Sequence, residues 1–239
     1  MTILCIETST SVCSAALWQD GEVLAQRISR EGGNHAKLLP RFVEELTASG
    51  ARVDAVAVSA GPGSYTGLRI GVSTAKGLCY GWRVPLVAVP TLEVLCEAAV
   101  KAKGEGLKAK GEGLLCPMID ARRMEVYTAL YDSRLAAQCE VAASIVDETF
   151  AGQFGENDAS VYYFGDGAEK CQQVLNRAPW QYVPDIVPEA QYVGPLAAAR
   201  LSRPAGEGKD VLRGNEIAYY EPFYLKEFVA AQSHVKGLK

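Results

Sequence analysis

The run GPGSYTGLRIG occupies residues 61–71 and determines the fold of the first half of this chain. It follows an apolar segment at residues 53–59, which reads as a buried strand, and leads into a helical pattern that ends near Trp82. Glycines and a proline between a strand and a helix indicate a tight backbone turn. The free N–H groups at such a helix start could also bind an anion. The spacing G-x-G-x-x-x-G matches neither the dinucleotide fingerprint nor the P-loop, so the pattern favours a structural turn.

The composition of the chain is that of a globular protein, with 49% hydrophobic and 22% charged residues in 239. A net charge of −4 makes it a poor binder of nucleic acid on its own, because phosphate contacts need clustered Lys and Arg. We therefore expect a partner to supply most of any contact with RNA. The sequence contains no apolar run of membrane-spanning length and no secretory signal, so we expect no membrane association.

The residues that usually carry metal or nucleophilic chemistry are sparse. The seven cysteines are odd in number and never in C-x-x-C spacing, which indicates free thiols in a reducing cytoplasm. The two histidines, His35 and His234, lie outside any H-E-x-x-H pattern, and G-x-S-x-G is missing from the sequence. His35 at the start of a helical stretch is more typical of a cap or a surface group than of a ligand. We expect a cytoplasmic protein without a metal site.

The first hundred residues follow the order βββαβαβα. The sequence predicts strands at residues 2–8, 12–19 and 22–29, a helix at 34–49, a strand at 53–59, a helix at 66–82, a strand at 85–89 and a helix at 91–102. The second and third strands flank Asp20-Gly21, a pair typical of a two-residue hairpin turn. Asn34 could cap the first helix, and Pro40 inside it predicts a kink or a later start.

The second half repeats this order. It predicts strands at residues 114–120, 124–131 and 137–142, a helix at 146–154, a strand at 161–164, a helix at 168–177, a strand at 181–183 and a helix at 195–202. Two copies of βββαβαβα describe an α/β fold of duplicated ribonuclease-H-like units, the actin-like (ASKHA) plan. We expect these units at residues 1–103 and 114–239. Between them, KAKGEGL at 101–107 is repeated without change at 108–114 and should form a flexible surface loop.

Three turns of this plan carry candidate nucleotide contacts. The candidates are Thr8, Ser9 and Thr10 after the first strand, Asp120 and Arg122 at the matching turn of the second unit, and Gly165 and Gly167 after a later strand. Hydroxyl-rich turns commonly bond only to their own backbone, and a carboxylate beside arginines commonly forms surface ion pairs. Because these structural alternatives are favoured, we expect no cofactor.

The helical stretches at residues 34–49 and 66–82 are candidates for a protein interface. Small residues recur every fourth position along the second stretch, which lets another helix approach to roughly 8 Å between axes. That helix could belong to this chain, the simpler alternative, or to another subunit. The candidate interface residues are His35, Leu38, Leu39, Phe42, Leu68, Arg69, Gly71, Val72, Ala75 and Cys79.

Five segments together closely resemble the TsaB (YeaZ) family. They are ILCIETST at residues 3–10, HAKLLP at 35–40, AGPGSYTGLRIG at 60–71, DAR at 120–122 with Val126-Tyr127, and PFYLK at 222–226. The resemblance spans the chain and implies a part in forming N6-threonylcarbamoyladenosine beside the anticodon of tRNAs that read codons beginning with A. It also implies partners, namely the transferase TsaD, the ATPase TsaE and a second copy of the chain.

The resemblance further indicates the non-catalytic relative of TsaD. TsaD carries H-x-E-G-H after the strand that matches residues 85–89, and both of its histidines bind a metal; here Thr91 and Leu95 stand at those positions and only Glu93 is kept. TsaD's later aspartate ligand has no acidic counterpart around residues 193–197. Threonine and leucine cannot replace two imidazoles as metal ligands. We therefore expect a scaffold that activates TsaD; the alternatives are an actin-like ATP-dependent kinase or hydrolase acting alone and, least favoured, a peptidase.

Overall fold

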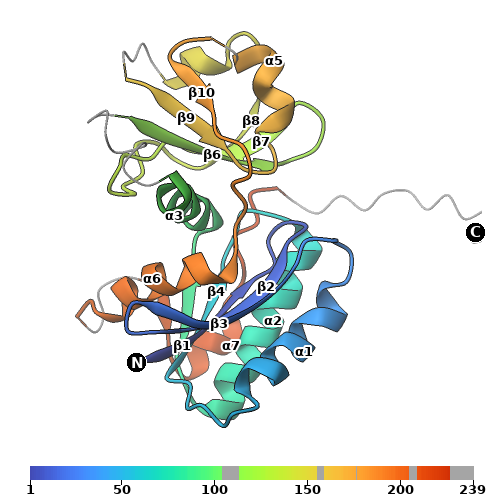
Figure 1. The fold of residues 1–239 in the computed structure, drawn as a ribbon, viewed down its shortest axis with the longest axis vertical. Helices are drawn as coiled ribbons and strands as arrows, with labels where there is room; N and C mark the ends of the chain where they lie inside the picture. Colours follow the sequence, from blue (N-terminus) through green and yellow to red (C-terminus); the bar gives the residue numbers. More distant parts are fainter. Residues whose placement is uncertain (104–112, 155–158, 176, 205–208, 227–239) are drawn as a thin grey trace, which may run out of the picture.

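The chain folds into two lobes, each built on a mixed β-sheet (Figure 1). The computed structural model describes residues 1–103, 113–154, 159–175, 177–204 and 209–226. The sheet of the first lobe has six strands in the order β11-β5-β4-β1-β2-β3, and the sheet of the second lobe has five in the order β10-β9-β6-β7-β8. Most of the predicted loop at 101–114 and His234 lie outside the described residues.

The strands of the first sheet lie close to their predicted positions. They are β1 (Thr2–Glu7), β2 (Cys13–Gln19), β3 (Glu22–Ser29), β4 (Ala55–Ser59) and β5 (Leu86–Val89). The first three form an antiparallel meander, and β1, β4 and β5 are parallel neighbours. Asp20 and Gly21 both have positive φ, which confirms the predicted hairpin turn between β2 and β3.

Helices cover both faces of the first sheet, so β1 and β4 are completely buried. The helices of this lobe are α1 (His35–Thr47), α2 (Tyr65–Trp82), α6 (Ala190–Leu201) and α7 (Asn215–Tyr219). Leu4 and Ile6 of β1 share a core with α1 and α2, whereas Ile3 and Cys5 share a core with Val193 and the rest of α6. The alternating side chains of one strand therefore bind helices on opposite sides of the sheet.

The first helix does not start late at its proline. The carbonyl of Asn34 accepts the N–H groups of Lys37 and Leu38, so helical bonding begins before Pro40, which lies inside α1. The side chain of Asn34 makes no capping bond. Of the two predicted alternatives, a kink or a later start, the later start is therefore excluded, because the bonded turn upstream of the proline already belongs to the helix.

The second lobe departs more from the predicted elements. Its strands are β6 (Leu114–Asp120), β7 (Glu125–Thr128), β8 (Ala142–Ile145), β9 (Val161–Phe164) and β10 (Trp180–Tyr182), and its helical segments are η1 (Phe150–Phe154), η2 (Glu169–Cys171) and α5 (Gln172–Leu175). The predicted strand at 137–142 is wrong, since pairing with β7 selects residues 142–145. The predicted helix at 146–154 shortens to a 3-10 turn, because the Asp147 carboxylate accepts both the N–H and the hydroxyl of Thr149.

The two ribonuclease-H-like units exchange their last helices. Helix α3 (Thr91–Lys103) packs on β6, and its Leu92 and Leu95 share a core with Leu115 of the second lobe. Conversely, α6 begins at Ala190 rather than at the predicted 195 and packs on the first sheet. The short strand β11 (Val211–Leu212) then joins the first sheet beside β5.

This exchange qualifies the predicted division of the chain. Helix α6, strand β11 and helix α7 pack with the first lobe, although the prediction assigned everything after residue 114 to the second unit. The division at 101–114 thus describes the repeat in the sequence and not the packing of the lobes. The repeated order of strands and helices confirms the duplicated actin-like fold.

Candidate functional site

The glycines of the run at 61–71 pack against the turn that follows β1. A Cβ atom added at Gly63 would lie 2.4 Å from the carbonyl oxygen of Ser9, and one at Gly67 would lie 2.0 Å from that of Thr8. A Cβ atom at Gly71 would lie 2.3 Å from the hydroxyl oxygen of Thr8. Real side chains cannot approach a backbone oxygen this closely. Glycine is therefore required here so that α2 can lie directly on the first turn of the chain.

The other end of the run packs against the C-terminal segment. Gly61 has a φ of +106°, and a Cβ atom there would lie 2.4 Å from the carbonyl oxygen of Phe223. The N–H of Phe223 donates to the carbonyl of Ala60 at 2.7 Å. Ser64 caps α2 by accepting the N–H of Gly67 at 3.3 Å. The packing and the cap support the structural-turn interpretation of this run over the anion-site one.

The hydroxyls of the turn after β1 are bonded within the first lobe. Thr8 donates to the carbonyl of Gly67 at 2.8 Å, and Ser9 donates to the Glu7 carboxylate at 2.6 Å. The hydroxyl of Thr10 accepts the backbone N–H two residues further on, at 3.2 Å. All three side chains are buried. The turn therefore bonds to its own lobe, which is the alternative the sequence favoured over nucleotide contact.

A buried carboxyl that sequence reasoning missed lies at the base of this turn. Glu7 is fully buried, and burial raises the pKa of its carboxyl, with the hydroxyls of Ser59 and Ser9 acting in the opposite direction. Asp166 of the second lobe adds a further rise through charge repulsion, and burial likewise raises the pKa of Asp166. The signal in the sequence was an acidic residue that directly ends a run of five strand residues, Thr2–Ile6.

Asp120 and Arg122, candidate nucleotide contacts, lie at the turn that follows β6. The Asp120 carboxylate forms an ion pair with the ammonium group of Lys170 in the same lobe. From Arg122 it accepts a hydrogen bond of the backbone N–H, at 3.1 Å. A Cβ atom at Gly165 would lie 2.2 Å from the carbonyl of Met118, and one at Gly167 would lie 2.9 Å from the N–H nitrogen of Asp120. These turns are therefore held by close backbone packing and an ion pair within the second lobe.

Thr91, Glu93 and Leu95, which the resemblance sets against TsaD's metal-binding segment, all make contacts within this chain. The hydroxyl of Thr91 accepts the N–H of Gly61 at 3.1 Å, and Leu95 is fully buried in the core of the second lobe. Glu93 forms an ion pair of 2.7 Å with Arg200. In the described ranges, no three His, Cys, Asp or Glu side chains group closely enough to hold a metal ion. Thr91, Glu93 and Leu95 thus do not fit a metal.

Most of the predicted interface residues face the interior of this chain. Those buried are His35, Leu39, Leu68, Gly71, Val72, Ala75 and Cys79. His35 bonds the carbonyl of Thr10 at 2.9 Å, and the small-residue stripe of α2 packs on the sheet. Leu38 and Phe42 are half-buried, and Arg69 is exposed. Internal packing, the simpler alternative, therefore holds for the stripe.

A second row of small residues lies on the outward face of α2. Gly77 and Gly81 have open space where a Cβ atom would stand, and Ser73 is exposed. Tyr80 is 88% exposed on the same side. We call these four residues of α2 the outward face. Figure 1 shows α1 and α2 side by side at the outside of the first lobe.

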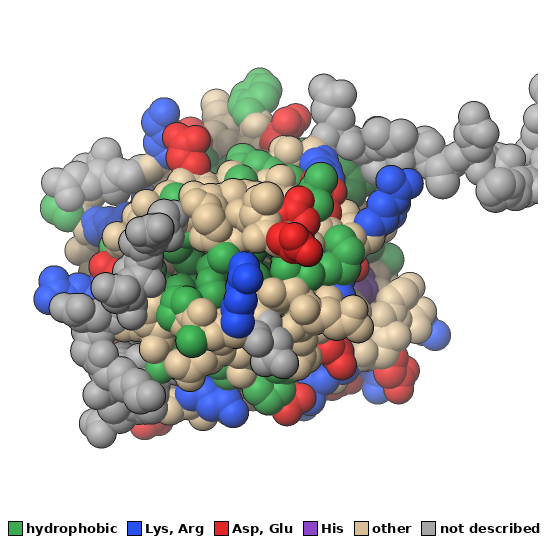
Figure 2. All heavy atoms as spheres, turned by 90° about the horizontal axis from the view of Figure 1, so that it is seen from above, with side chains coloured by type: hydrophobic (Ala, Val, Ile, Leu, Met, Phe, Trp, Pro, Cys, Tyr) green, Lys and Arg blue, Asp and Glu red, His purple; other side chains and the backbone are tan. Residues whose placement is uncertain are grey.

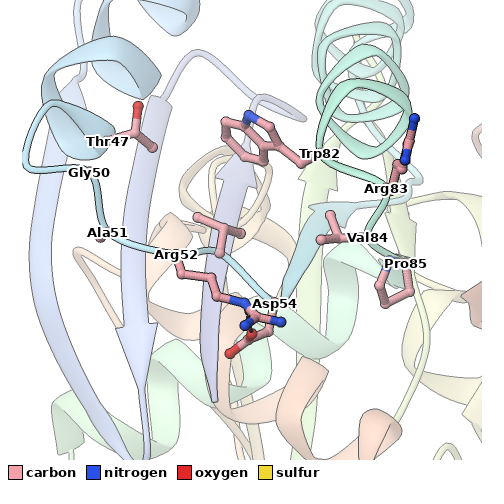
Figure 3. A pocket seen from close by; sticks show the side chains of 10 residues that line it. Thr47, Gly50, Ala51, Arg52, Asp54, Trp82, Arg83, Val84 and Pro85 are labelled. Atoms are coloured by element: carbon pink, nitrogen blue, oxygen red, sulfur yellow. Dashed lines mark ion pairs between the residues drawn. The ribbon is translucent and has the colours of Figure 1, made fainter.

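A hollow of about 580 Å³ lies where α1 and α2 end (Figure 3). Trp82 projects from the end of α2 on one side of it, and Arg52 lies beside Asp54, with which it pairs at 3.5 Å. An aromatic ring and charged groups therefore line the hollow. None of the helices in the described residues has the length and apolarity needed to cross a bilayer.

Comparisons with known proteins agree with this architecture. The model of the TsaD family, described as tRNA N6-adenosine threonylcarbamoyltransferase, matches residues 23–154, just over half of the chain. The solved structure of YeaZ from Pseudomonas aeruginosa is similar with a TM-score of 0.73 and 26% identity, covering 94% of this chain and 99% of that one.

Two curated relatives carry the same protein name. The tRNA threonylcarbamoyladenosine biosynthesis protein TsaB of Escherichia coli (strain K12) is 31% identical over 252 residues, which cover 96% of each chain. TsaB of Bacillus subtilis (strain 168) is 32% identical over 211 residues, which cover 86% of this chain and 84% of its own. Identity at this level over nearly the full length of both chains shows the family that the sequence motifs indicated. This chain belongs to the TsaB (YeaZ) family, and its residues 23–154 carry the domain that the TsaD family model describes.

Proposed function

We propose that this protein acts in the formation of N6-threonylcarbamoyladenosine in tRNAs that read codons beginning with A, as a non-catalytic activator of TsaD. In this proposal it works in the cytoplasm, in a complex that also contains the ATPase TsaE. Membership of the TsaB family supports the pathway, since both curated relatives are named for tRNA threonylcarbamoyladenosine biosynthesis.

The observation that supports the non-catalytic role is that the side chains at positions 91, 93 and 95 all make structural contacts within this chain. Thr91 holds the glycine turn through Gly61, Glu93 holds Arg200, and Leu95 lies in the core. Each side chain at these positions therefore contributes to packing or to a structural bond. A Lewis acid in this cleft would need imidazole or carboxylate ligands directed at one point.

The outward face is the proposed docking site for TsaD. Tyr80 offers a large aromatic surface, and the open positions at Gly77 and Gly81 let a partner helix come close to the backbone of α2. An aromatic anchor beside a flat backbone is typical of the centre of a protein interface. In this proposal a second copy of the chain uses the same face, so the homodimer and the complex with TsaD exclude one another.

Contact with tRNA is proposed to be indirect. The chain has a net charge of −4, and Figure 2 shows Lys and Arg interspersed with Asp and Glu on the end of the second lobe seen there. Nucleic-acid sites need clustered positive charge over an extended surface. The transferase and its assembly partners would then supply most of the tRNA contact.

The test is a charged substitution on the outward face. Gly77→Arg places a long cationic side chain into open space, so the chain should fold while the approach of a partner helix is blocked. We expect loss of co-purification with TsaD and loss of the modified nucleoside, measured by mass spectrometry of tRNA, in cells that depend on this chain. Gly77→Ala is the matched control and should keep both.

Two results would contradict the proposal. One is normal co-purification and normal tRNA modification with Gly77→Arg, which would remove the outward face as the docking site. The other is threonylcarbamoyl transfer by the purified chain without TsaD, which would show that it is itself a catalyst. Gly71→Arg cannot serve this test, because a Cβ atom there already lies 2.3 Å from Thr8 and the variant would disturb the fold.

A further inference from the structure

A groove of about 530 Å³ runs between α2 and the C-terminal segment at residues 220–226. Arg69 and Lys76 line it from α2, and Tyr224 and Lys226 line it from the C-terminal segment. None of the turns discussed above as candidate nucleotide contacts takes part in its lining. The volume lies in the range of small-ligand sites and exceeds what a single phosphate group needs.

Two of the cations in this groove form hydrogen bonds to uncharged groups. Within the described ranges, neither Arg69 nor Lys76 belongs to an ion pair. Arg69 donates to the hydroxyl of Tyr65 at 3.1 Å, and Lys76 donates to the carbonyl of Tyr220 at 2.9 Å. Both partners are uncharged, so both positive charges remain available to a ligand.

The remaining charges of the groove reduce this field only in part. Lys226 is paired with Glu125 of the second lobe and adds no net charge. Glu221 is an exposed carboxylate at the same groove, set against the two cations of α2. The groove is therefore locally positive in a chain whose net charge is −4. Such a local concentration of positive charge attracts anions.

The aromatic side chains orient the arginine. The guanidinium carbon of Arg69 lies 5.4 Å from the centre of the Tyr65 ring, and that ring lies 4.9 Å from the ring of Tyr224. A guanidinium held over a ring keeps its planar fork in one direction, which suits two-point binding of phosphate oxygens. The groove also runs beside the first turns of α2, which contain no acidic residue, so the helix dipole favours an anion there.

We infer that this groove binds a phosphate group of a nucleotide, with Arg69 and Lys76 contacting the phosphate oxygens. The shared chemistry is a nucleoside phosphate, supplied by a free nucleotide or by a nucleotide within RNA; the second source would replace the indirect tRNA contact proposed above with a direct one. The inference stands on the charges and geometry of the groove, which adjoins the outward face at Ser73.

The test measures binding of adenosine 5′-monophosphate to the purified full-length chain by calorimetry. We expect saturable binding, at least tenfold weaker binding of adenosine, and at least a tenfold loss of affinity in Arg69→Gln, because charge-assisted bonds to phosphate are the strong ones. Lys76→Gln should give a similar loss. Arg52→Gln, in the hollow at the ends of α1 and α2, is the matched control and should bind as the wild type does.

A single-stranded RNA hexamer separates the two sources of phosphate. If the hexamer competes with the mononucleotide and binds more tightly, the ligand is RNA; if the mononucleotide binds more tightly, the ligand is a free nucleotide. Lack of saturation by either ligand at millimolar concentration would overturn the inference. So would equal affinity of the wild type and both groove variants, and so would an equal loss in Arg52→Gln. Thermal melting of each variant identifies any loss that comes from unfolding.

Discussion

The hydroxyl of Thr8 donates a 2.8 Å hydrogen bond to the carbonyl oxygen of Gly67, and so ties the turn after β1 to the second strand-helix unit of the lobe. These two residues are 59 positions apart in the sequence. The carbonyl of Thr8 lies 2.0 Å from where a Cβ atom of Gly67 would stand. The glycine run is thus a packing motif, since it brings two backbones together and leaves room for one hydroxyl between them.

Gly67→Ala should destabilise the chain strongly. The added methyl group must push α2 away from the Thr8 carbonyl, and overpacking of this kind costs about 1–3 kcal/mol or more. Urea denaturation should show a lower midpoint, and the free energy of unfolding extrapolated to water should fall by an amount in this range. The matched control is Gly77→Ala in the same helix, where a Cβ atom meets open space. It should raise stability by roughly 0.5–1 kcal/mol through helix propensity, and a loss as large as that of Gly67→Ala would refute the packing explanation.

The ion pair of Glu93 with Arg200 should contribute strongly to the joining of the two lobes. Arg200 is 7% exposed on its side chain and links α6 to α3. Arg200→Met leaves the Glu93 carboxylate without its partner and should lower the free energy of unfolding by about 3 kcal/mol. Arg203→Met, which removes a half-exposed arginine at the end of the same helix, should change it by less than about 0.5 kcal/mol.

A double-mutant cycle tests the same pair. Because Glu93→Gln removes the charge that Arg200→Met would strand, the double variant should be more stable than the sum of the single changes predicts, by at least about 1 kcal/mol. Additive effects would mean that the two side chains stabilise the chain independently.

Glu7 should make the stability of the chain depend on pH. Burial raises the pKa of Glu7, so the folded chain binds its proton more tightly than the unfolded chain does. Stability therefore falls as the pH rises above the ordinary glutamate value of 4.5. Glu7→Gln removes this titration. The difference in the free energy of unfolding between the variant and the wild type should therefore be constant below pH 4.5. Above that pH it should shift in favour of the variant by up to about 1.4 kcal/mol per pH unit. A pH-independent difference, measured by urea unfolding between pH 4 and pH 7, would contradict it.

One thiol of the native chain should react readily. Cys139 is exposed, whereas the other six cysteines are buried. Burial raises the pKa of Cys79 and of Cys116 to about 12, which suppresses the reactive thiolate as well as access to it. Mass spectrometry after brief alkylation should find one modification, on Cys139, and all seven only after denaturation. Early labelling of a core cysteine such as Cys116 would show that the second lobe opens under native conditions.

The parts of the fold that the sequence predicts well are those fixed by local pattern. The strand and turn signals around Asp20-Gly21 and the segment at 53–59 carry their own periodicity, and both elements form where they were expected. Residues 137–154 have weaker patterns, and there the pairing with β7 and the bonds of Asp147 decide the outcome. Local pattern does not contain these partners, so the sequence misplaced a strand and a helix.

The candidate site shows the same limit. The stripe of Gly71 and Ala75 was visible in the sequence, but whether it meets a partner or the chain itself depends on Thr8, which only the fold brings next to it. The groove at Lys76 could not be predicted, because the segment that closes it begins 144 residues later, at Tyr220. Glu7 was readable as an acidic strand end, yet its burial requires both neighbouring strands.

Helix α6 covers the face of the first sheet that contains Ile3 and Cys5, although it is synthesised only after the whole second lobe. While the nascent chain grows on the ribosome, this apolar face has no cover of its own. The first lobe therefore cannot complete its folding by itself. An early stop in translation releases a fragment that exposes apolar surface and is prone to aggregation. Chaperones that shield exposed apolar strands would be needed most during that interval.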